Sequence, residues 1–348
     1  MEERRTVLIT GGCGFIGSNL VRHILVSRPA WRVVNVDLLT YAGIKDNLRD
    51  IEHDPRYVFV KADIGDVDTM RQVFEHCGPW ALINCAAETH VDRSLNSGVD
   101  FVRTNVLGTQ VMLEITRLYG CRLLHVSTDE VYGSLGPAGS FQEESPLRPN
   151  SPYAASKAAA DLLALAAHRS FGQDVVITRC SNNYGPYQHP EKLISLIITN
   201  AIEYQDLPVY GEGENIRDWL HVADHCRALV MALEKGKSGR IYNFGGGDEM
   251  CNIAVVRLIL SILGRPESLI RFVADRPGHD FRYSVDFRRA NEELGWKPEI
   301  PFQDGLIGTV RWYVENEDWW RAIKGESYKQ YYDRQYRTRL GGAKWSGG

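Results

Sequence analysis

The stretch LITGGCGFIGSNLV, residues 8–21, decides the fold. An apolar run leads directly into glycines spaced as Gly12-x-Gly14-x-x-Gly17, and Gly11 adds a second, wider glycine spacing. Glycines between a first strand and a first helix let the backbone turn tightly and approach a pyrophosphate, whose charge then meets the helix N-terminus. This context predicts a dinucleotide-binding turn, and the alternative is an ordinary glycine-rich turn.

Strand-like and helix-like runs continue to alternate up to about residue 180. The strand candidates are 6–10, 32–37, 57–63, 81–87, 122–128 and 174–180, and the helix candidates are 16–27, 66–76, 101–119 and 153–171. Continuous apolar strands separated by helices indicate a parallel sheet that is covered on both faces. We therefore expect an α/β fold, with a Rossmann-like doubly wound parallel sheet and a smaller C-terminal α/β substrate-binding domain.

The rhythm changes after residue 180, where loops rich in Asn, Gly, Pro and Tyr alternate with helices such as 252–263. We expect residues 1–180 to form the nucleotide-binding domain and residues 181–340 to form the second domain. Segments within 218–245 are expected to rejoin the first domain. The small, polar end of the chain, 341–348, is expected to be a disordered tail.

Composition excludes several classes of protein. The 348 residues carry a formal net charge of −4 without a Lys/Arg block, which argues against nucleic-acid binding. The chain has no apolar run of the ~18 residues that a membrane span needs, and it begins without a secretory signal. The seven scattered cysteines, without a C-x-x-C pair, are typical of reduced thiols. We expect a cytoplasmic protein without a metal site.

Asp37 indicates which dinucleotide binds. It stands twenty residues after Gly17, at the end of the second predicted strand. A carboxylate there accepts both ribose hydroxyls and repels a 2′-phosphate, so the expected cofactor is NAD rather than NADP. Leu38 follows in place of an arginine, which favours the same choice. Asp63 and Ile64 are candidates for the adenine edge, although a structural role for Asp63 is nearly as well supported.

Two further motifs carry catalytic residue types. STDEVYG places Thr128, Asp129 and Glu130 at the end of a predicted strand. SPYAASKA places Tyr153 and Lys157 four residues apart, on one face of a helix whose start Ser151-Pro152 would cap. The usual pKa of a phenol is ~10, so Tyr153 needs neighbouring positive charge, from the ammonium and from an oxidised nicotinamide, before it can accept a proton near neutral pH.

Together these motifs resemble those of the extended short-chain dehydrogenase/reductases that act on nucleotide sugars, and among them the dTDP-glucose 4,6-dehydratases. The resemblance runs from Thr6 to about Tyr332. It rests on TGGCGFIGSN, CAAETHVDRS, TNVLGT, STDEVYG, SPYAASKA, RCSNNYGPYQHPEKLI, NIRDWLHVADH and RPGHDFRY. The adjacent Asp-Glu pair is the most specific of these features, since related epimerases and reductases as a rule have the hydroxyl and the Tyr/Lys pair without it.

The resemblance implies a redox-neutral dehydration. NAD would take a hydride from C4 while Tyr153 takes the hydroxyl proton and Thr128 holds the oxygen. Glu130 would remove the C5 hydrogen and Asp129 would protonate the departing C6 hydroxyl. Opposed roles require different pKa values, so one carboxyl pKa should be raised. Successive side chains of a strand point to opposite faces, so the strand must end before the pair.

The resemblance also implies a full set of contacts. NAD contacts are expected from Gly11, Gly14, Phe15, Ile16, Gly17, Asp37, Leu38, Thr40, Asp63, Ile64, Ala86, Ala87, Thr104, Tyr153, Lys157 and Asn183. Substrate contacts are expected from Thr89, Thr128, Asn182, Lys192, Leu193, Pro208, Tyr210, Arg217, Asn252, Asp275 and His279. Lys192 and Arg217 would hold the diphosphate and Tyr210 would stack on the pyrimidine. Phe281, where the family usually has Arg, leaves a contact at that position in doubt.

Alternatives remain open at this stage. A UDP-sugar 4-epimerase or a UDP-N-acetylglucosamine dehydratase would use the same scaffold, and a dinucleotide-sensing regulator would need only the glycine turn and Asp37. Thymine and uracil differ by one methyl, worth ~1 kcal/mol when buried, which the sequence does not resolve. His90, Asp92 and Arg93 are equally well explained as a polar loop network. From the family we expect a homodimer formed by the helices over 101–119 and 154–168.

Overall fold

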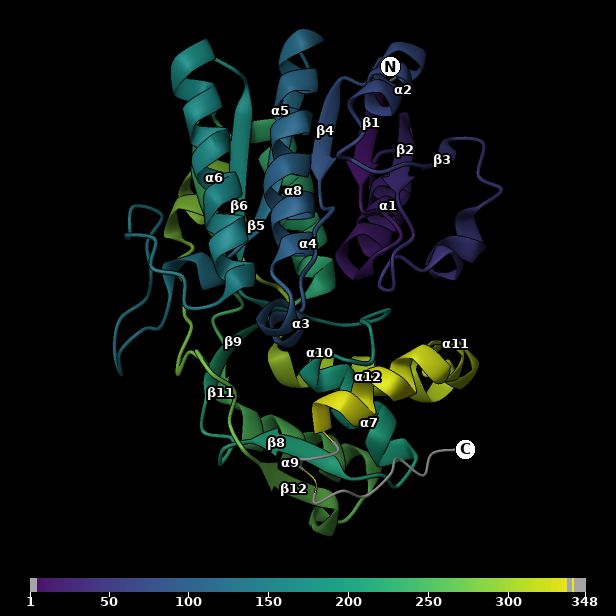
Figure 1. The fold of residues 1–348 in the computed structure, drawn as a ribbon, viewed down its shortest axis with the longest axis vertical. Coiled ribbons are helices and arrows are strands. Elements are labelled where there is room, and N and C mark those ends of the chain that lie inside the picture. Colours follow the sequence, from purple (N-terminus) through teal and green to yellow (C-terminus); the bar gives the residue numbers. More distant parts are fainter. Residues whose placement is uncertain (1–4, 337–339, 341–348) are drawn as a thin grey trace.

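The computed structural model describes residues 5–336 and 340. In this part of the chain, seven parallel strands form one sheet in the order β10-β6-β5-β4-β1-β2-β3 (Figure 1). The strands are β1 (Arg5–Thr10), β2 (Trp31–Asp37), β3 (Tyr57–Lys61), β4 (Ala81–Asn84), β5 (Arg122–Thr128), β6 (Val175–Cys180) and β10 (Ile241–Phe244). The predicted parallel sheet is confirmed. Residues 341–348, predicted to be a disordered tail, lie outside the described residues.

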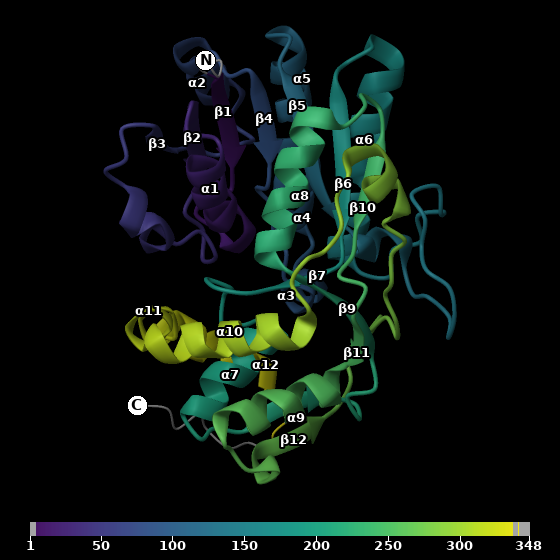
Figure 2. The ribbon, with the colours of Figure 1, turned by 180° about the vertical axis from the view of Figure 1, so that it is seen from behind.

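Helices cover both faces of this sheet, which is why its strands are apolar on both sides. On one face lie α1 (Phe15–Ser27) and α8 (Val222–Lys235), which Figure 2 shows in front. On the other lie α2 (Val67–Cys77), α5 (Thr109–Leu118) and α6 (Pro152–Phe171), in front in Figure 1. Leu20 and Ile24 pack with Leu229 on the first face, and Met112 packs with Leu123 on the second, all fully buried.

The helix predicted over 101–119 is interrupted. It consists of α4 (Val99–Phe101), a π-helical segment (Val102–Gly108) and α5. Within the wider turn, the Asn105 amide bonds both backbone groups of Glu88 at 2.9 Å and donates to Ser156 Oγ at 2.8 Å. Asn105 thereby fastens the loop after β4 to α6, because the π turn directs its side chain between them.

The second part of the molecule is built on two small sheets. Its elements are β7 (Asn182–Tyr184), α7 (Leu193–Ile202), β8 (Leu207–Tyr210), β9 (Ile216–His221), β11 (Glu249–Cys251), α9 (Asn252–Leu263), β12 (Ile270–Val273), α10 (Phe302–Glu315), α11 (Glu317–Ile323) and α12 (Glu326–Tyr336). Strands β11-β9-β7 form one sheet and β12-β8 the other. Ile197, Val256 and Leu306 join α7, α9 and α10 in a separate core.

Two later segments return to the large sheet. Strand β10 pairs with β6, and α8 packs against α1. Trp296, fully buried, lies in the same core as α8. On these contacts we propose that the nucleotide-binding domain comprises residues 5–180 together with 222–244 and the segment around Trp296.

The order in which the strands are added to the sheet reverses between β1 and β4. From β1 the chain extends outward to β2 and β3, and β4 then starts on the other side of β1. The loops that follow β1 and β4 therefore open at the same edge, which is where ligands bind in open parallel sheets. No helix in the described part of the chain is long and apolar enough to cross a membrane.

Candidate active site

The glycine turn after β1 is shaped by close backbone approaches. Gly11 has φ +69°, a conformation that side-chain-bearing residues rarely adopt. A Cβ at Gly17 would lie 2.2 Å from the carbonyl oxygen of Gly11. The amide of Gly14 donates to that same carbonyl oxygen at 3.1 Å. The turn thus needs glycines to bring the start of α1 against the loop.

The carboxylate of Asp37 is fixed at the end of β2. Its Oδ2 accepts from the amide of Cys13 at 2.9 Å and its Oδ1 accepts from the amide of Leu39 at 2.8 Å. Burial raises the pKa of Asp37, and the two backbone amides oppose this. Asp63 makes a similar local turn, accepting from the amide of Gly65 at 2.8 Å. Both carboxylates face the cavity described below.

Strand β5 ends at Thr128, and a 3₁₀ turn over Asp129–Tyr132 follows it at once. The hydroxyl of Thr128 donates to Asp129 Oδ1 at 3.3 Å and accepts from the amide of Glu130 at 3.3 Å. Because the strand has ended, the two carboxyl side chains are not forced to opposite faces, and both line the same cavity. This meets the geometric condition set by the sequence.

The two carboxyl groups differ in their surroundings. Burial, followed by the charge of Glu130, raises the pKa of Asp129 well above its usual range, and its side chain is 1% exposed. Burial also raises the pKa of Glu130, but the cations Arg276, Lys192 and Arg217 oppose that rise. Asp129 is thus the group that stays protonated and Glu130 the one more readily ionised.

Helix α6 presents the tyrosine and the lysine. Ser151 Oγ accepts from the amide of Ala154 at 3.1 Å and caps the helix, with Pro152 in its first turn. Lys157 Nζ donates to the carbonyl of Val126 at 2.8 Å. The pKa of Tyr153 is raised well above its usual value by burial and then by Glu130. The sequence predicted that the ammonium of Lys157 would lower the pKa of Tyr153. The pKa is raised instead, because the effects of burial and of nearby carboxylates are larger.

One cavity gathers most of the predicted site. It is lined by all the residues predicted to contact NAD, and also by the predicted catalytic and substrate residues Thr89, Thr128, Asp129, Glu130, Asn182 and Lys192. The cavity is also lined by residues that the sequence did not single out, among them Ser127, Cys180, Tyr187, His189 and Glu191.

The remaining predicted substrate residues do not line this cavity. They are Leu193, Pro208, Tyr210, Arg217, Asn252, Asp275 and His279. They belong to the part built on the small sheets, where His279 Nδ1 lies 2.6 Å from Asp275 Oδ1 and the ring of His279 lies 6.0 Å from that of Tyr210. Arg217 is buried and donates to the backbone carbonyls of Asp280 and Phe281.

Arg276 was not singled out as a site residue from the sequence, although the motif that contains it was. Its charge is the largest cationic influence on the pKa of Glu130, and its guanidinium lies 3.3 Å from Asp92 Oδ1. Its place inside the motif DRPGH was the available signal, but no local pattern shows that this loop approaches Glu130. Asp92 also accepts from the hydroxyl of Tyr210 at 3.0 Å.

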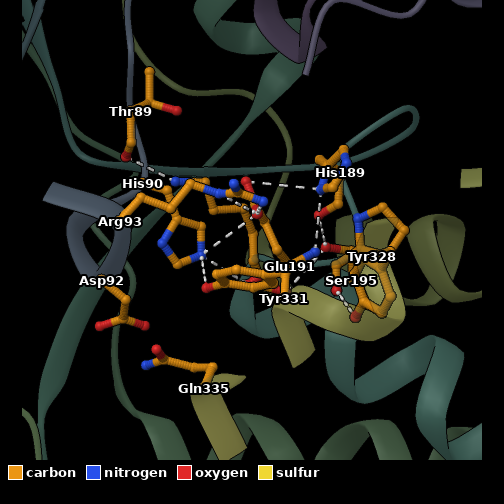
Figure 3. A network of polar contacts seen from close by, with 12 residues as sticks. Thr89, His90, Asp92, Arg93, His189, Glu191, Ser195, Tyr328, Tyr331 and Gln335 are labelled. Atoms are coloured by element: carbon orange, nitrogen blue, oxygen red, sulfur yellow. Dashed lines mark hydrogen bonds and ion pairs between the residues drawn. The ribbon is translucent and has the colours of Figure 1, made fainter. Parts of the chain in front are cut away.

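The residues His90, Asp92 and Arg93 form a polar network in the structure. It joins α3 (Val91–Asn96) and the loop before it to Glu191 and to α12. Figure 3 shows His90 and Arg93 directed toward Glu191, with Asp92 apart from them. Arg93 Nε and Nη2 both donate to Glu191 Oε2 at 3.1 Å. In the described residues there is no group of three or more His, Cys, Asp and Glu side chains that could hold a metal ion.

Known proteins share this architecture and sequence. The family model for GDP-mannose 4,6 dehydratase matches residues 8–309. A dTDP-glucose 4,6-dehydratase of Streptomyces niveus is 51% identical over 323 residues, covering 91% of this chain and 95% of that protein. The crystal structure of dTDP-glucose 4,6-dehydratase from Bacillus anthracis in complex with NAD has a TM-score of 0.87 at 46% identity, covering 92% and 100% of the two chains. The dTDP-glucose 4,6-dehydratase of Streptomyces venezuelae, with NAD and the ligand TYD bound, has a TM-score of 0.89 at 50% identity, with the same coverage.

A UDP-glucose 4-epimerase is less similar in sequence. The enzyme from Thermotoga maritima, solved with UDP-glucose, is 27% identical with a TM-score of 0.84, covering 90% of this chain and 99% of its own. The fold is therefore common to both groups, whereas the sequence agrees far better with the dehydratases. The resemblance drawn from the motifs is confirmed, and the chain belongs to the dTDP-glucose 4,6-dehydratases, within the NAD-dependent epimerase/dehydratase family.

Proposed function

We propose that this chain catalyses the NAD-dependent dehydration of dTDP-glucose to dTDP-4-keto-6-deoxyglucose. The observation that carries the proposal is the presence of Asp129 and Glu130 in the same cavity as Thr128, Tyr153 and Lys157. Oxidation at C4 requires the hydroxyl and the Tyr/Lys pair, whereas loss of water across C5 and C6 requires an acid and a base in addition. The 51% identity to a dehydratase, against 27% to an epimerase, supports the same reaction.

The cavity fits NAD. Asp37 offers a carboxylate suited to ribose hydroxyls and unsuited to a 2′-phosphate. Ser127 Oγ and Asn182 Oδ1 are buried in the cavity lining without a hydrogen-bond partner among the described residues, and buried polar atoms in such positions are suited to a ligand. NAD bound here would supply the hydride acceptor for C4 and the hydride donor for C6.

Tyr153 and Thr128 act on the C4 hydroxyl in this proposal. Tyr153 accepts the hydroxyl proton and Thr128 donates a hydrogen bond to the oxygen. Because burial and Glu130 raise the pKa of Tyr153, the phenol holds its proton until positive charge builds up beside it. Lys157, fixed by the carbonyl of Val126 and buried, keeps one such charge in place.

Asp129 and Glu130 then carry out the elimination. Glu130 takes the C5 proton, which the neighbouring C4 ketone has acidified, and Asp129 gives its proton to the leaving C6 hydroxyl. The raised pKa of Asp129 suits a donor, and the cations around Glu130 favour its ionised form by opposing the rise that burial causes. Return of the hydride to C6 and of a proton from Glu130 to C5 would complete the product. The proton that Tyr153 took from the C4 hydroxyl would then balance, through solvent, the one that Asp129 gave to the departing water.

Lys192 and Arg217 are the proposed partners of the substrate diphosphate, and both carry influence on the pKa of Glu130. The residues at the small sheets, among them Tyr210, Asn252 and His279, are proposed to hold the nucleoside. They lie outside the cavity lining, so this assignment needs the substrate to extend from the cavity toward β8 and β9.

We also infer a homodimer through α5 and α6. Apolar side chains stand exposed on these helices and on the segment before α5: Leu162 is 57% exposed, Leu107 52% and Val102 57%. Apolar patches of this kind typically mark association surfaces. Figure 1 shows the two helices side by side on the outer face of the sheet.

The direct test is turnover of three candidate substrates. The purified protein is incubated separately with dTDP-glucose, UDP-glucose and UDP-N-acetylglucosamine, and the products are weighed by mass spectrometry. Loss of one water from dTDP-glucose alone, or much faster than from the others, is the expected result. Conversion to a C4 epimer of unchanged mass would instead assign the chain to the epimerases.

A further inference from the structure

Glu191 is a buried carboxylate that the proposed chemistry does not use. Its side chain is 1% exposed, yet it lines the cavity together with its neighbours His189 and Lys192. Burial alone would raise the pKa of Glu191, but the surrounding His90, His189, Arg93 and Lys192 bring it down to about 2. A charge buried this deeply is costly unless its partners hold it in one place.

Arg93 clamps this carboxylate. Its Nε–H and Nη2–H groups converge on one carboxylate oxygen, Glu191 Oε2, each at 3.1 Å. The guanidinium lies 3.8 Å from the ring centre of Tyr41 and 4.2 Å from that of Tyr331. Tyr41 belongs to the loop after β2 that lines the cavity, and Tyr331 belongs to α12, where its hydroxyl lies 3.2 Å from His90 Nε2. Figure 3 shows Arg93, His90 and His189 gathered around Glu191, with Tyr331 below them.

Lys192 follows Glu191 directly in the chain, and its side chain contacts a different residue of the segment before α3. Its ammonium donates to the carbonyl of Thr89 at 2.9 Å, next to His90 in the chain. Thus several contacts join the segments 89–93 and 189–192: Arg93 with the Glu191 carboxylate, His90 Nε2 with the Glu191 carbonyl oxygen at 3.4 Å, and Lys192 with Thr89. A shift of the Glu191 carboxylate would therefore also shift the backbone that carries the Lys192 ammonium.

We propose that Glu191, clamped by Arg93, is a positioning residue that keeps the ammonium of Lys192 charged and aimed into the cavity, where the diphosphate of the substrate binds. The inference rests on the proposed function, because it needs Lys192 to meet a diphosphate. It assigns to Glu191 an effect on binding that is exerted through Lys192, without contact to the reacting atoms.

The charges around Lys192 support this reading. Burial lowers the pKa of Lys192, and Glu191 is the largest charge that opposes the fall. The other charged or titratable groups that act on Lys192 or are acted on by it are Glu88, His90, Asp92, Glu130, His189 and Arg276. Without the charge of Glu191, the ammonium would lose its proton at a lower pH.

The test measures binding of dTDP to the NAD-loaded enzyme by calorimetry, from about pH 7 to about pH 9.5, where Lys192 is the group of interest. In Glu191→Gln, the pH at which binding weakens should fall below that of the wild type. At the alkaline end the variant should bind about tenfold more weakly than the wild type, the size of one lost charge-assisted contact. Arg93→Lys keeps both charges but loses the fork and the stacking, so it should weaken binding equally at every pH.

Glu203→Gln is the matched control. Glu203 is a buried carboxylate, with 8% side-chain exposure, that pairs with Lys324 at 2.6 Å and Arg321 at 2.7 Å away from the cavity. It should lower the melting temperature without shifting the dTDP profile. Wild-type turnover of dTDP-glucose is measured alongside. If the wild type turns over dTDP-glucose but the pH profile of dTDP binding is parallel in Glu191→Gln and the wild type, this inference alone is overturned. If the wild type neither binds dTDP nor turns over dTDP-glucose, both this inference and the proposed function are overturned.

Discussion

Asp129 and Glu130 are neighbours in sequence with different electrostatic surroundings. The charge of Glu130 adds to burial in raising the pKa of Asp129, whereas Arg276, Lys192 and Arg217 oppose the rise in the pKa of Glu130. Identical functional groups can therefore hold their protons differently at one pH. The assignment of acid and base follows from these surroundings and can be tested one residue at a time.

Glu130→Gln should separate oxidation from dehydration. The amide cannot accept the C5 proton, so we expect overall turnover to fall by about 10²- to 10⁴-fold, the usual contribution of a general base. Reduced cofactor should still form transiently, which near-ultraviolet absorbance in stopped flow would detect. Exchange of the C5 hydrogen with solvent should disappear, whereas the exposed control Glu52→Gln should keep it. Normal exchange in Glu130→Gln would show that another group is the base.

Asp129→Asn should stabilise the protein while it inactivates the elimination. The pKa of Asp129 is higher in the folded protein than in the unfolded chain, so the stability linked to its proton is complete at acid pH and is lost as the pH rises through the folded pKa. The variant should exceed the wild type by roughly 1 kcal/mol in unfolding free energy at alkaline pH, with little difference in acid.

Denaturant unfolding at several pH values measures this difference. The control is Asp68→Asn, a change at an exposed position in the first turn of α2, where removing a carboxylate from the helix N-terminus should lower stability slightly rather than raise it. A stability difference for Asp129→Asn that shrinks as the pH rises would contradict the raised pKa.

Residues in short motifs could be predicted from the sequence, and residues joined only by the fold could not. Thr128, Tyr153 and Lys157 were found because strand end and helix spacing fix them locally. Glu191 lines the cavity and Arg276 influences Glu130 through contacts of high sequence separation, Glu191 with Arg93 and Arg276 with Asp92. No local pattern carries that information.

At the level of elements, the turn between β1 and α1 forms part of the cavity lining. Gly17→Ala would place a Cβ 2.2 Å from the carbonyl oxygen of Gly11 and 2.7 Å from Gly12 Cα, so the backbone must shift. We expect the purified variant to lose most of its bound NAD, as measured by releasing and quantifying the cofactor. A full complement of NAD would show that the turn tolerates displacement.

Gly308→Ala is the control for this change. Gly308 lies inside α10, where an added Cβ would meet no described atom within 4 Å. Alanine there should raise the unfolding free energy by about 0.5–1 kcal/mol and leave NAD content unchanged, since it removes backbone freedom from the unfolded chain.

Elements with a strong period were predicted well, and their irregularities were not. The strands β1 to β6 and the helices α1 and α6 agree with the predicted ranges within a few residues, whereas β10 was foreseen only as part of the segments within 218–245 that rejoin the first domain. The π-helical segment inside the helix predicted over 101–119 was not predicted, because the spacing of apolar residues does not distinguish a short π-helical segment from an α-helix. Its cause is tertiary: Asn105 must reach the backbone of Glu88.

For the whole molecule, association through α5 and α6 makes a separate prediction. Leu162→Glu would place a charge on the exposed apolar face of α6, and a two-fold axis would bring it near its own copy. We expect the dimer to dissociate to a monomer in light scattering. Phe272→Glu, at a side chain 57% exposed on β12 at the far end of the molecule, should leave the mass unchanged. A wild type that is already monomeric, or an unaffected dimer in Leu162→Glu, would contradict the proposed interface.

The measurement that tests the central claim most directly is the mass of the product formed from dTDP-glucose in D₂O. The account predicts loss of one water, retention of one solvent deuterium at C5 and no net formation of reduced cofactor. This pattern requires the C5 proton to pass through a solvent-exchanging base, as assigned to Glu130. A product that has lost water but carries no deuterium would show that the C5 proton is returned before it exchanges with solvent, and an unchanged mass would contradict dehydration itself.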